Sequence, residues 1–239
     1  LQRVCDVVGA QVFISTYYSA PLTTPSLMMV YDMIPEVAGY DLELPEWREK
    51  RTCIEAARRY IAISRNTLRD LRRIHPGIAG ERIDVAYPAA DPLFRPVAGD
   101  EMERFNARHG ITRPYFLLVG ARDSQYKNAG VFFRAFAALP DRSRYGVLCV
   151  GGEREVAAPA RRACAGSELH HLRLDDEELR LAYGGAIALV YPSIYEGFGM
   201  PVVEAMRCGC PVVSTSHASL PEAAGDAAIF INPHDSGGL

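Results

Sequence analysis

The sequence predicts an α/β fold built from two parallel-sheet domains, and three observations carry this prediction. Short runs that favour β-strands alternate with segments of helical periodicity along the whole chain. The strand-like runs are largely apolar, as expected for parallel strands that helices cover on both faces. A stretch with three prolines in ten residues, from Tyr87 to Pro96, interrupts this alternation. Two doubly wound domains that face each other across a cleft fit this pattern.

Ten strands are expected, four before the proline-rich stretch and six after it. The predicted strands are Gln11–Thr16, Leu27–Asp32, Tyr60–Ser64, Ile83–Tyr87, Tyr115–Val119, Tyr145–Val150, Leu169–Leu174, Ala186–Tyr191, Pro211–Ser214 and Ala227–Ile231. Helical periodicity is clearest at Pro45–Arg59, Ala129–Leu139 and Glu177–Tyr183.

The proline-rich stretch is predicted to connect the two domains. Pro88, Pro92 and Pro96 disfavour helix and strand alike. We therefore assign residues 1–96 to a first domain and residues 97–239 to a second. A length of 239 residues allows two small or incomplete domains, and the first is short for a complete one.

Composition and charge exclude several classes of protein. The chain has 26 basic and 29 acidic residues, a net charge of −3 and 49% hydrophobic residues, as ordinary globular proteins do. This balance gives no overall electrostatic reason to bind nucleic acid. Of the six cysteines only Cys208 and Cys210 are close, without zinc-ligand spacing, so we expect reduced, buried cysteines in a cytoplasmic protein. The longest apolar runs are far shorter than the ~20 residues of a membrane span.

The most informative stretch follows the strand that ends at Tyr191. A glycine-bearing loop comes next, and a helix is predicted to start near Met200, where Pro201 suits the first turn. This order places free backbone N–H groups and the positive end of a helix dipole at the carboxyl edge of a parallel sheet. Gly197 and Gly199 allow a ligand to approach the backbone closely. The stretch therefore predicts a site for an anionic ligand.

Glu196 and Glu204 are the carboxylates of this stretch. They are eight positions apart, or roughly 12 Å of helical rise, so they do not resemble the ~5 Å pair of a retaining glycosidase. They fit two hydroxyl-rich parts of one extended ligand instead. Alternatively, Ser193–Glu196 is a capping box and Glu204 a solvated residue; the intervening Gly-Phe-Gly disfavours this interpretation.

A second candidate site lies in the segment Val119–Asn128, again a strand end followed by a loop. Arg122 and Lys127 are predicted to project from it as cations suited to a diphosphate. On their own, two basic residues in a loop are more often only solvated. The segment has neither the Gly-x-Gly-x-x-Gly pattern of dinucleotide sites nor the Gly-Lys-Ser/Thr of a P-loop.

Taken together, these stretches make the chain resemble the retaining glycosyltransferases of family 4, which have the GT-B fold and are typified by bacterial mannosyltransferases. The resemblance covers Phe13 to Pro233. The segments that carry it are Glu-x7-Glu at Glu196–Glu204, Val119-Gly-Ala-Arg with Tyr126-Lys-Asn, Ser219-Leu-Pro-Glu-Ala-Ala-Gly-Asp-Ala-Ala228, and Ala62-Ile-Ser with Tyr87-Pro-Ala-Ala-Asp-Pro-Leu-Phe-Arg-Pro96.

The resemblance implies roles for these residues. Arg122 and Lys127 would grip the donor diphosphate, Glu196 would lie beside the hydroxyls of the transferred sugar, and Glu204 would bind the ribose. The first three count as catalytic. The donor-binding residues that it implies are Gly120, Arg122, Lys127, Arg173, Leu174, Gly197, Phe198, Gly199, Met200 and Glu204. Arg173 and Leu174 would border the nucleobase, just before a helix capped at Asp175.

The acceptor side departs from the family pattern. Many members carry a His before Asp32, whereas this chain has Tyr31. Asp32 is therefore either a catalytic contact on the acceptor side or the capping residue of a turn at the strand end. We expect Ser219–Glu222 to act as a helix capping box and His217 to lie on the surface.

The resemblance also implies the partners. The expected donor is a GDP-, UDP- or dTDP-linked sugar, with a lean towards GDP-mannose, and the acceptor a glycan, a lipid-linked sugar or a small molecule. No metal or other cofactor is expected, and no Asp-x-Asp occurs that could hold a divalent ion. The expected location is the cytoplasm, with a peripheral contact at the inner face of the membrane left open. The natural protein is expected to be longer than this chain. A non-catalytic nucleotide-sugar-binding module is the alternative.

Overall fold

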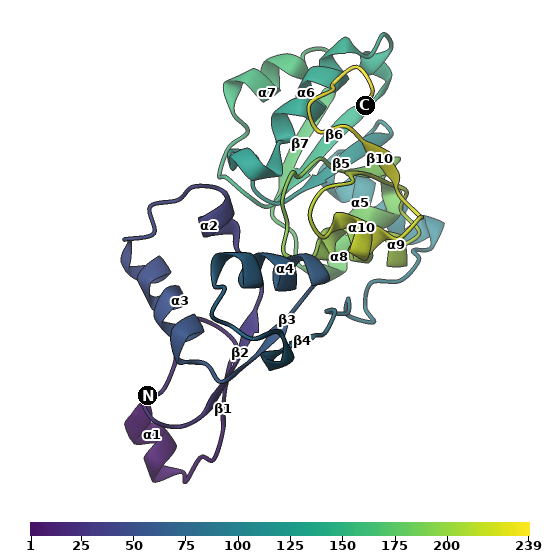
Figure 1. Cartoon of the computed structure of the whole chain (residues 1–239). Coiled ribbons are helices and arrows are strands. Elements are labelled where there is room, and N and C mark those ends of the chain that lie inside the picture. Colours follow the sequence, from purple (N-terminus) through teal and green to yellow (C-terminus); the bar gives the residue numbers. More distant parts are fainter. The chain divides into compact units, whose positions relative to one another are not determined.

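The computed structural model describes all residues from Leu1 to Leu239, and these form two compact units (Figure 1). The first unit comprises Leu1–Pro88 and the second Ala89–Leu239. Each unit contains one parallel sheet with helices packed on it, which confirms the predicted α/β class.

The first unit has a four-stranded parallel sheet in the order β1-β2-β3-β4. Its core combines Met28 and Val30 of the sheet with Ile54 and Leu71 of the helices. The helices and strands are α1 (Gln2–Val7), β1 (Phe13–Ser15), β2 (Ser26–Val30), α2 (Ile34–Val37), α3 (Pro45–Ala56), β3 (Arg59–Ala62), α4 (Arg65–Ile74) and β4 (Ile83–Val85).

The second unit has a six-stranded sheet in the order β10-β9-β8-β5-β6-β7, with all neighbours parallel. Its elements are α5 (Gly99–His109), β5 (Tyr115–Val119), α6 (Ala129–Ala138), β6 (Gly146–Val150), α7 (Ala158–Ala163), β7 (Glu168–Leu172), α8 (Asp176–Gly185), β8 (Ala188–Tyr191), α9 (Met200–Arg207), β9 (Val212–Thr215), α10 (Leu220–Ala224) and β10 (Ile229–Ile231).

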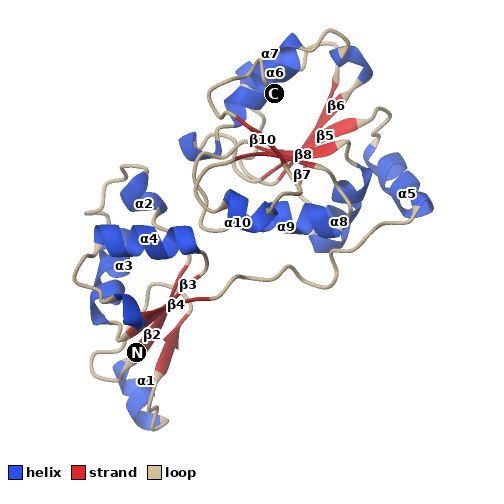
Figure 2. Ribbon diagram, turned by 45° about the vertical axis from the view of Figure 1, so that its right-hand side comes forward, coloured by secondary structure: helices blue, strands red, loops and turns tan.

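Helices cover both faces of this second sheet. In Figure 2, α6 and α7 lie on one face, and α8, α9 and α10 lie on the other. Chain order runs outward from β5 in both directions, through β6 and β7 on one side and through β8, β9 and β10 on the other. The switch of direction falls between β5 and β8, and in doubly wound sheets ligands bind outside the carboxyl ends of the strands at such a point.

The ten predicted strands are all present, with ends that differ by a few residues. Tyr115–Val119 has the predicted bounds, and the predicted helices at Pro45 and Ala129 begin at those residues. Asp175 caps α8, because its carboxylate accepts the backbone N–H of Glu178 at 2.9 Å. Periodicity therefore identified the elements well, since nearly all of them bury one apolar face or two.

The predicted boundary at residue 96 is too late. Ala90 and Phe94 are buried in the core of the second unit, where the ring of Phe94 packs edge-on against Tyr183 with centroids 6.0 Å apart. The units therefore divide after Pro88, inside the proline-rich stretch. The prolines exclude regular structure there, but they do not prevent a side chain from packing.

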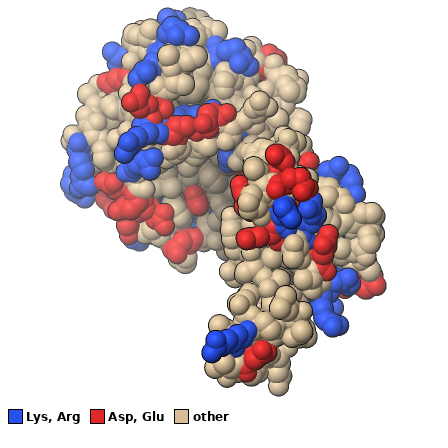
Figure 3. All heavy atoms as spheres, turned by 90° about the vertical axis from the view of Figure 1, so that its left-hand side faces the viewer, with Lys and Arg blue, Asp and Glu red and all other residues tan.

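Surface charge and cysteine placement agree with the composition. On the face shown in Figure 3, acidic and basic side chains are interspersed. All six cysteines are buried and none forms a disulfide, as predicted. None of the helices combines the length and the apolar character that a bilayer span requires.

Replacing Phe94 by Ala tests its assignment to the second unit. The residue is 4% exposed, and loss of a buried phenyl ring should lower the free energy of unfolding by about 3–5 kcal/mol. The neighbouring Arg95→Ala is the control, because Arg95 is exposed and should change it by less than ~0.5 kcal/mol. Urea unfolding measures both variants. Equal effects would show that Phe94 is not part of the core.

Candidate functional site

The candidate site lies at the carboxyl ends of β5 and β8, on the two sides of the switch point. β5 is followed by the loop of residues 120–128, and β8 by the loop of residues 192–199. Because β5 and β8 are parallel neighbours, both loops leave the same edge of the sheet. The sheet thus brings together two segments that are far apart in the sequence.

Lys127 and Glu196 form the central contact between these loops. The ammonium group of Lys127 lies 2.8 Å from Glu196 Oε1 and 3.0 Å from the hydroxyl oxygen of Tyr191, to which it also donates. The side chains are largely buried, 17% exposed for Lys127 and 9% for Glu196. A lysine has three N–H donors, so one remains for a ligand.

Backbone and side-chain hydrogen bonds hold the two loops in this arrangement. The N–H of Ile194 donates to the carbonyl oxygen of Tyr126 at 2.8 Å. Asn128 has a positive φ of 53°, which asparagine tolerates better than most residues, and its side-chain amide donates to the Pro192 carbonyl at 3.2 Å. The two residues of the Lys-Asn pair therefore differ in function. Asn128 shapes and anchors the turn, and this turn places Lys127 against Glu196.

The second loop ends in α9, which begins at the predicted residue, Met200. Gly199 precedes it with a φ of 111°, and a Cβ on Gly199 would lie 2.9 Å from the side chain of Leu220. Glycine is thus required by conformation and by space. Pro201 has no N–H, and the N–H of Val202 donates to the Gly199 carbonyl oxygen at 3.0 Å, so the start of α9 offers the N–H of Met200 and the positive end of the helix dipole at the sheet edge. No helix follows Glu196 directly, which excludes the alternative capping box at Ser193–Glu196.

Ser219 does not cap α10, and this part of the prediction is wrong. Its side chain makes no capping hydrogen bond. The buried hydroxyl lies instead 2.8 Å from the carbonyl oxygen of Glu196 and 3.0 Å from that of Phe198, and donates between them. Ser219 therefore fixes the backbone of the second loop at Glu196 and Phe198.

Glu204 lies inside α9, eight residues after Glu196. The hydroxyl of Tyr183 donates to its Oε2 at 2.9 Å. Burial raises the pKa of the Glu204 carboxyl, and the hydrogen bond from Tyr183 partly opposes this rise. The two glutamates are thus held by different partners and do not form a pair.

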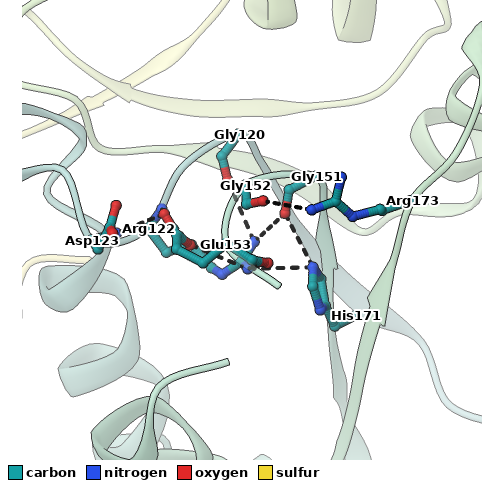
Figure 4. Close-up of polar contacts among 8 residues, drawn as sticks. All are labelled: Gly120, Arg122, Asp123, Gly151, Gly152, Glu153, His171 and Arg173. Atoms are coloured by element: carbon teal, nitrogen blue, oxygen red, sulfur yellow. Dashed lines mark hydrogen bonds and ion pairs between the residues drawn. The ribbon is translucent and has the colours of Figure 1, made fainter. Parts of the chain in front are cut away.

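Arg122 does not project from the sheet edge as predicted. Figure 4 shows its guanidinium turned towards the loop after β6. It donates to the carbonyl oxygens of Gly151 at 2.7 Å and Glu153 at 3.1 Å, and its side chain is 7% exposed. His171 on β7 lies 3.4 Å from the same group. Carbonyl groups at the ends of the neighbouring strands attract the cation more than open solvent does.

Glu153 completes this cluster from the other side (Figure 4). Its carboxylate accepts the backbone N–H of Arg122 at 2.8 Å and that of Asp123 at 3.1 Å, and it pairs with the Arg122 guanidinium at 3.2 Å. Partial burial alone would raise the pKa of Glu153, but hydrogen bonds from the Asp123 carboxyl and the backbone lower it to about 2. The cluster therefore fixes the loop that follows β5 to the loop that follows β6.

The remaining predicted donor residues lie at the same edge. Gly120 follows β5 with a φ of 101°, and a Cβ on Gly152 would come 2.5 Å from the Gly120 carbonyl oxygen, so the two loops touch closely. Arg173 is exposed and donates to the Gly152 carbonyl at 3.4 Å, and Leu174 packs on the core. Gly120, Arg122 and Lys127 line one small pocket.

Asp32 lies in the first unit, where it caps a turn at the end of a strand, one of the two roles considered for it above. Its Oδ1 accepts the N–H of Ile34 at 2.8 Å, at the start of α2. The neighbouring Tyr31 is 37% exposed. His217 is exposed, as expected. The structure contains no group of three or more His, Cys, Asp or Glu side chains that could hold a metal ion.

Four contacts at this edge were not predicted from the sequence. They are made by Tyr191 with Lys127, Tyr183 with Glu204, Glu153 with Arg122 and Ser219 with the second loop. Tyr191 had a signal, because it ends a predicted strand beside the second loop, and Ser219 belongs to a segment that carries the family resemblance, although its contact was not predicted. Tyr183 and Glu153 lie in a predicted helix and a loop without special composition.

Replacing Glu153 by Gln tests the cluster. A carboxyl whose pKa is lowered from 4.5 to about 2 on folding stabilises the protein above pH 4.5 and loses this effect as the pH falls towards 2. At neutral pH the variant should have a lower free energy of unfolding, because it loses the ion pair with Arg122 and the charged acceptor of two backbone N–H groups; the raised pKa of Asp123 beside Glu153 opposes part of this loss. At about pH 3 the difference should shrink.

Urea unfolding at both pH values measures this difference. Glu155→Gln is the matched control, since Glu155 is exposed and makes only a long ion pair of 3.9 Å. If Glu153→Gln lowers the free energy of unfolding by as much at low pH as at neutral pH, the ionic role of Glu153 is contradicted.

Comparisons with known proteins agree with this geometry. The chain is 53% identical over 60 residues to the O-antigen chain mannosyltransferase B of Escherichia coli, a match that covers 25% of this chain and 16% of that protein. It is 29% identical over 226 residues to the alpha-maltose-1-phosphate synthase of Mycolicibacterium smegmatis, which covers 89% of this chain and 58% of that protein. The chain thus spans between about a sixth and somewhat over half of these relatives.

Structural similarity extends over both units. The crystal structure of HepE from Anabaena in complex with UDP-glucose matches 98% of this chain and 69% of that one, with a TM-score of 0.76 and 18% identity. This likeness confirms the predicted GT-B fold. Residues 113–239, more than half of the chain, match the family described as "Glycosyl transferases group 1". The chain belongs to the group 1 glycosyltransferases, which form family 4.

Proposed function

We propose that this chain belongs to a retaining glycosyltransferase that moves a sugar from a nucleotide-diphospho-sugar to a glycan, a lipid-linked sugar or a small acceptor. The observation that carries the proposal is the Lys127–Glu196 pair beside the start of α9, at the switch point of the second sheet. In this proposal the second unit binds the donor and the first unit binds the acceptor.

The chemistry of glycosyl transfer suits this arrangement. The bond from the sugar carbon to the diphosphate breaks, and its electron pair leaves with the diphosphate, so negative charge grows on the phosphate oxygens. The remaining N–H of Lys127 and the N–H of Met200 at the positive end of α9 are preorganised donors for this charge. They supply without a metal what a divalent ion supplies elsewhere, which supports transfer without a metal cofactor.

Each glutamate takes a role that fits its partners. Glu196, held by Lys127 next to the expected phosphate position, would accept hydrogen bonds from the hydroxyls of the transferred sugar. Glu204, held by Tyr183 inside α9, would bind the ribose, and Arg173 and Leu174 would border the base. We assign Arg122 an indirect role, since its guanidinium is committed to the loops after β5 and β6 and positions them.

Mannose is the proposed sugar. Support comes from the mannosyltransferase name of the Escherichia coli relative and from the Tyr126-Lys-Asn and Ser219-Leu-Pro-Glu segments, whereas the UDP-glucose bound to HepE shows that the fold also accepts glucose donors. The buried, unpaired cysteines are typical of a reducing compartment, which supports the cytoplasm as the place of the reaction.

Replacing Lys127 by Ala tests the proposed role of the ion pair. Loss of one preorganised electrostatic contact should lower turnover at saturating donor by ~10²-fold. Arg144→Ala is the matched control, since Arg144 is an exposed cation just before β6, at the opposite end of that strand from the site, and should leave turnover unchanged. Transfer of radiolabelled sugar, at a temperature where both variants are folded, gives the rates. Turnover of Lys127→Ala near the parent value would refute this role.

The donor is tested by offering GDP-mannose, UDP-glucose and dTDP-glucose side by side to the same acceptor mixture. We expect GDP-mannose to be used best and the anomeric configuration of the donor to be kept, as NMR coupling constants of the product report. Inversion of the anomeric centre would contradict the retaining assignment, and preference for UDP-glucose would contradict the mannose assignment.

A further inference from the structure

Four aromatic side chains form a continuous row in the first unit, at the carboxyl edge of its sheet. Tyr17 and Tyr18 lie just after β1 and stack on each other, with ring centroids 4.3 Å apart and planes inclined by 24°. Trp47 of α3 meets Tyr18 edge-on at 6.1 Å, and Tyr40 meets Trp47 in the same way at 5.9 Å. Each ring thus contacts the next.

Buried charges anchor the middle of this row. Lys50, only 1% exposed, lies 5.9 Å from the ring centroid of Tyr18. Its ammonium group donates to Glu36 at 2.8 Å and to the carbonyl oxygen of Asp32 at 3.0 Å. The row is therefore tied to the turn of Asp32 at the end of β2, where the acceptor-side contact is expected.

The ends of the row remain open to solvent. Tyr17 is 66% exposed and Tyr40 is 42% exposed, although each ring is ordered by its neighbour. Exposed, grouped aromatic rings are typical of binding surfaces, and rings already held in place lose little entropy when a ligand arrives.

A cavity of about 650 Å³ lies between Leu1, the segment after β1 and helix α3, and Tyr18 is the ring of the row that lines it. Its volume is in the range of small-molecule sites. Hydroxyl and charged groups share its wall with apolar ones: the lining includes Tyr18, Ser19, Pro45, Arg48, Glu49 and Thr52. Such a mixed wall suits a ligand that has apolar faces and many hydroxyl groups.

The charge around the row selects against anionic ligands. Asp41, Glu43, Glu46 and Glu49 are exposed in the segment that carries Trp47, where Arg48 and Arg51 are the accessible basic residues and Lys50 is buried against Glu36. Carboxylates repel phosphate and sulfate groups, and they accept hydrogen bonds from hydroxyls. A neutral sugar matches both features, because the C–H groups on one face of its ring carry partial positive charge that is attracted to the face of an aromatic ring.

We propose that Tyr17, Tyr18, Trp47 and Tyr40 form a platform that binds sugar rings of a neutral glycan, so that the acceptor is an oligosaccharide recognised over more than one sugar unit. The identification of this glycan as the acceptor rests on the proposed function, whereas binding of the glycan does not.

The only tryptophan of the chain, Trp47, is a built-in reporter of this binding. The chain is titrated with mannotriose, maltotriose and mannose, without any nucleotide, while its fluorescence is recorded. We expect a saturable change with at least one trisaccharide and a much weaker affinity for the monosaccharide. Absence of a saturable change with both trisaccharides would overturn the proposal, as would equal affinity for mannose.

Variants locate the binding. Tyr17→Ala and Tyr40→Ala should each weaken the affinity for the trisaccharide by about tenfold, the order of one aromatic contact. Tyr17→Phe and Tyr40→Phe keep the ring and should keep the affinity. Leu22→Ala is the control, since Leu22 is 89% exposed but outside the row. Circular dichroism checks folding, and if the Ala variants unfold, the Phe variants and the parent titration still decide. Equal affinity for all folded variants would overturn the proposal.

Two further measurements distinguish the platform from the donor site and from a membrane-binding surface. Lys127→Ala should bind the trisaccharide as the parent does, because Lys127 belongs to the proposed donor site. If transfer fails but this binding persists, the proposed function is wrong and the platform stands; if transfer occurs but no glycan binds, the platform is wrong.

Co-sedimentation with phosphatidylglycerol vesicles that Tyr17→Ala abolishes would show that the row binds membranes instead.

Discussion

The buried ion pair between Lys127 and Glu196 is the contact on which the rest of the site depends. The two residues are 69 positions apart, and each follows a strand next to the switch point. Removing the partner of a buried charge costs about 3–5 kcal/mol, so the two loops have to converge accurately. The Ile194–Tyr126 hydrogen bond, the side chain of Asn128 and the hydroxyl of Ser219 are all explained by this requirement.

Arg122 and Lys127, the two basic residues of the loop after β5, have different roles. The terminal nitrogens of Arg122 bind carbonyl groups and Glu153, while its buried Nε has no hydrogen-bond partner, so the guanidinium stabilises the sheet edge on which a ligand would lie. Lys127 keeps one donor for a ligand beside the start of α9. A planar guanidinium with five N–H groups suits the first task, since it can bind several fixed acceptors at once, and a compact ammonium suits the second.

Much of the fold could be predicted from the sequence, because local patterns determine it. The ten strands follow from apolar runs, and the starts of α6 and α9 from the loops before them. Contacts that join distant segments could not be predicted in this way. Ser219 has the spacing of a capping box, yet its hydroxyl binds carbonyls of another loop. Phe94 follows two prolines, yet its ring enters the core. In both cases tertiary packing outweighs the local preference.

The same holds for the site. The glycine-bearing loop, the two glutamates and the basic residues were found from the sequence, because glycine and charged residues at strand ends have few structural reasons to occur. The direction in which a flexible side chain points was not determined there. Arg122 turns towards β6 and β7 because acceptors lie there, and those acceptors come from residues 151–171.

Thermal unfolding with GDP, UDP, dTDP and ADP, each with and without EDTA, tests the central claim of a metal-free diphosphate site most directly. A ligand at 100 times its dissociation constant adds about 2.7 kcal/mol, which should raise the midpoint of a chain of this size by roughly 5–10 °C. We predict such a shift with one nucleotide above the others, unchanged by EDTA. No shift with any nucleotide, or a shift that EDTA abolishes, would contradict the site described here.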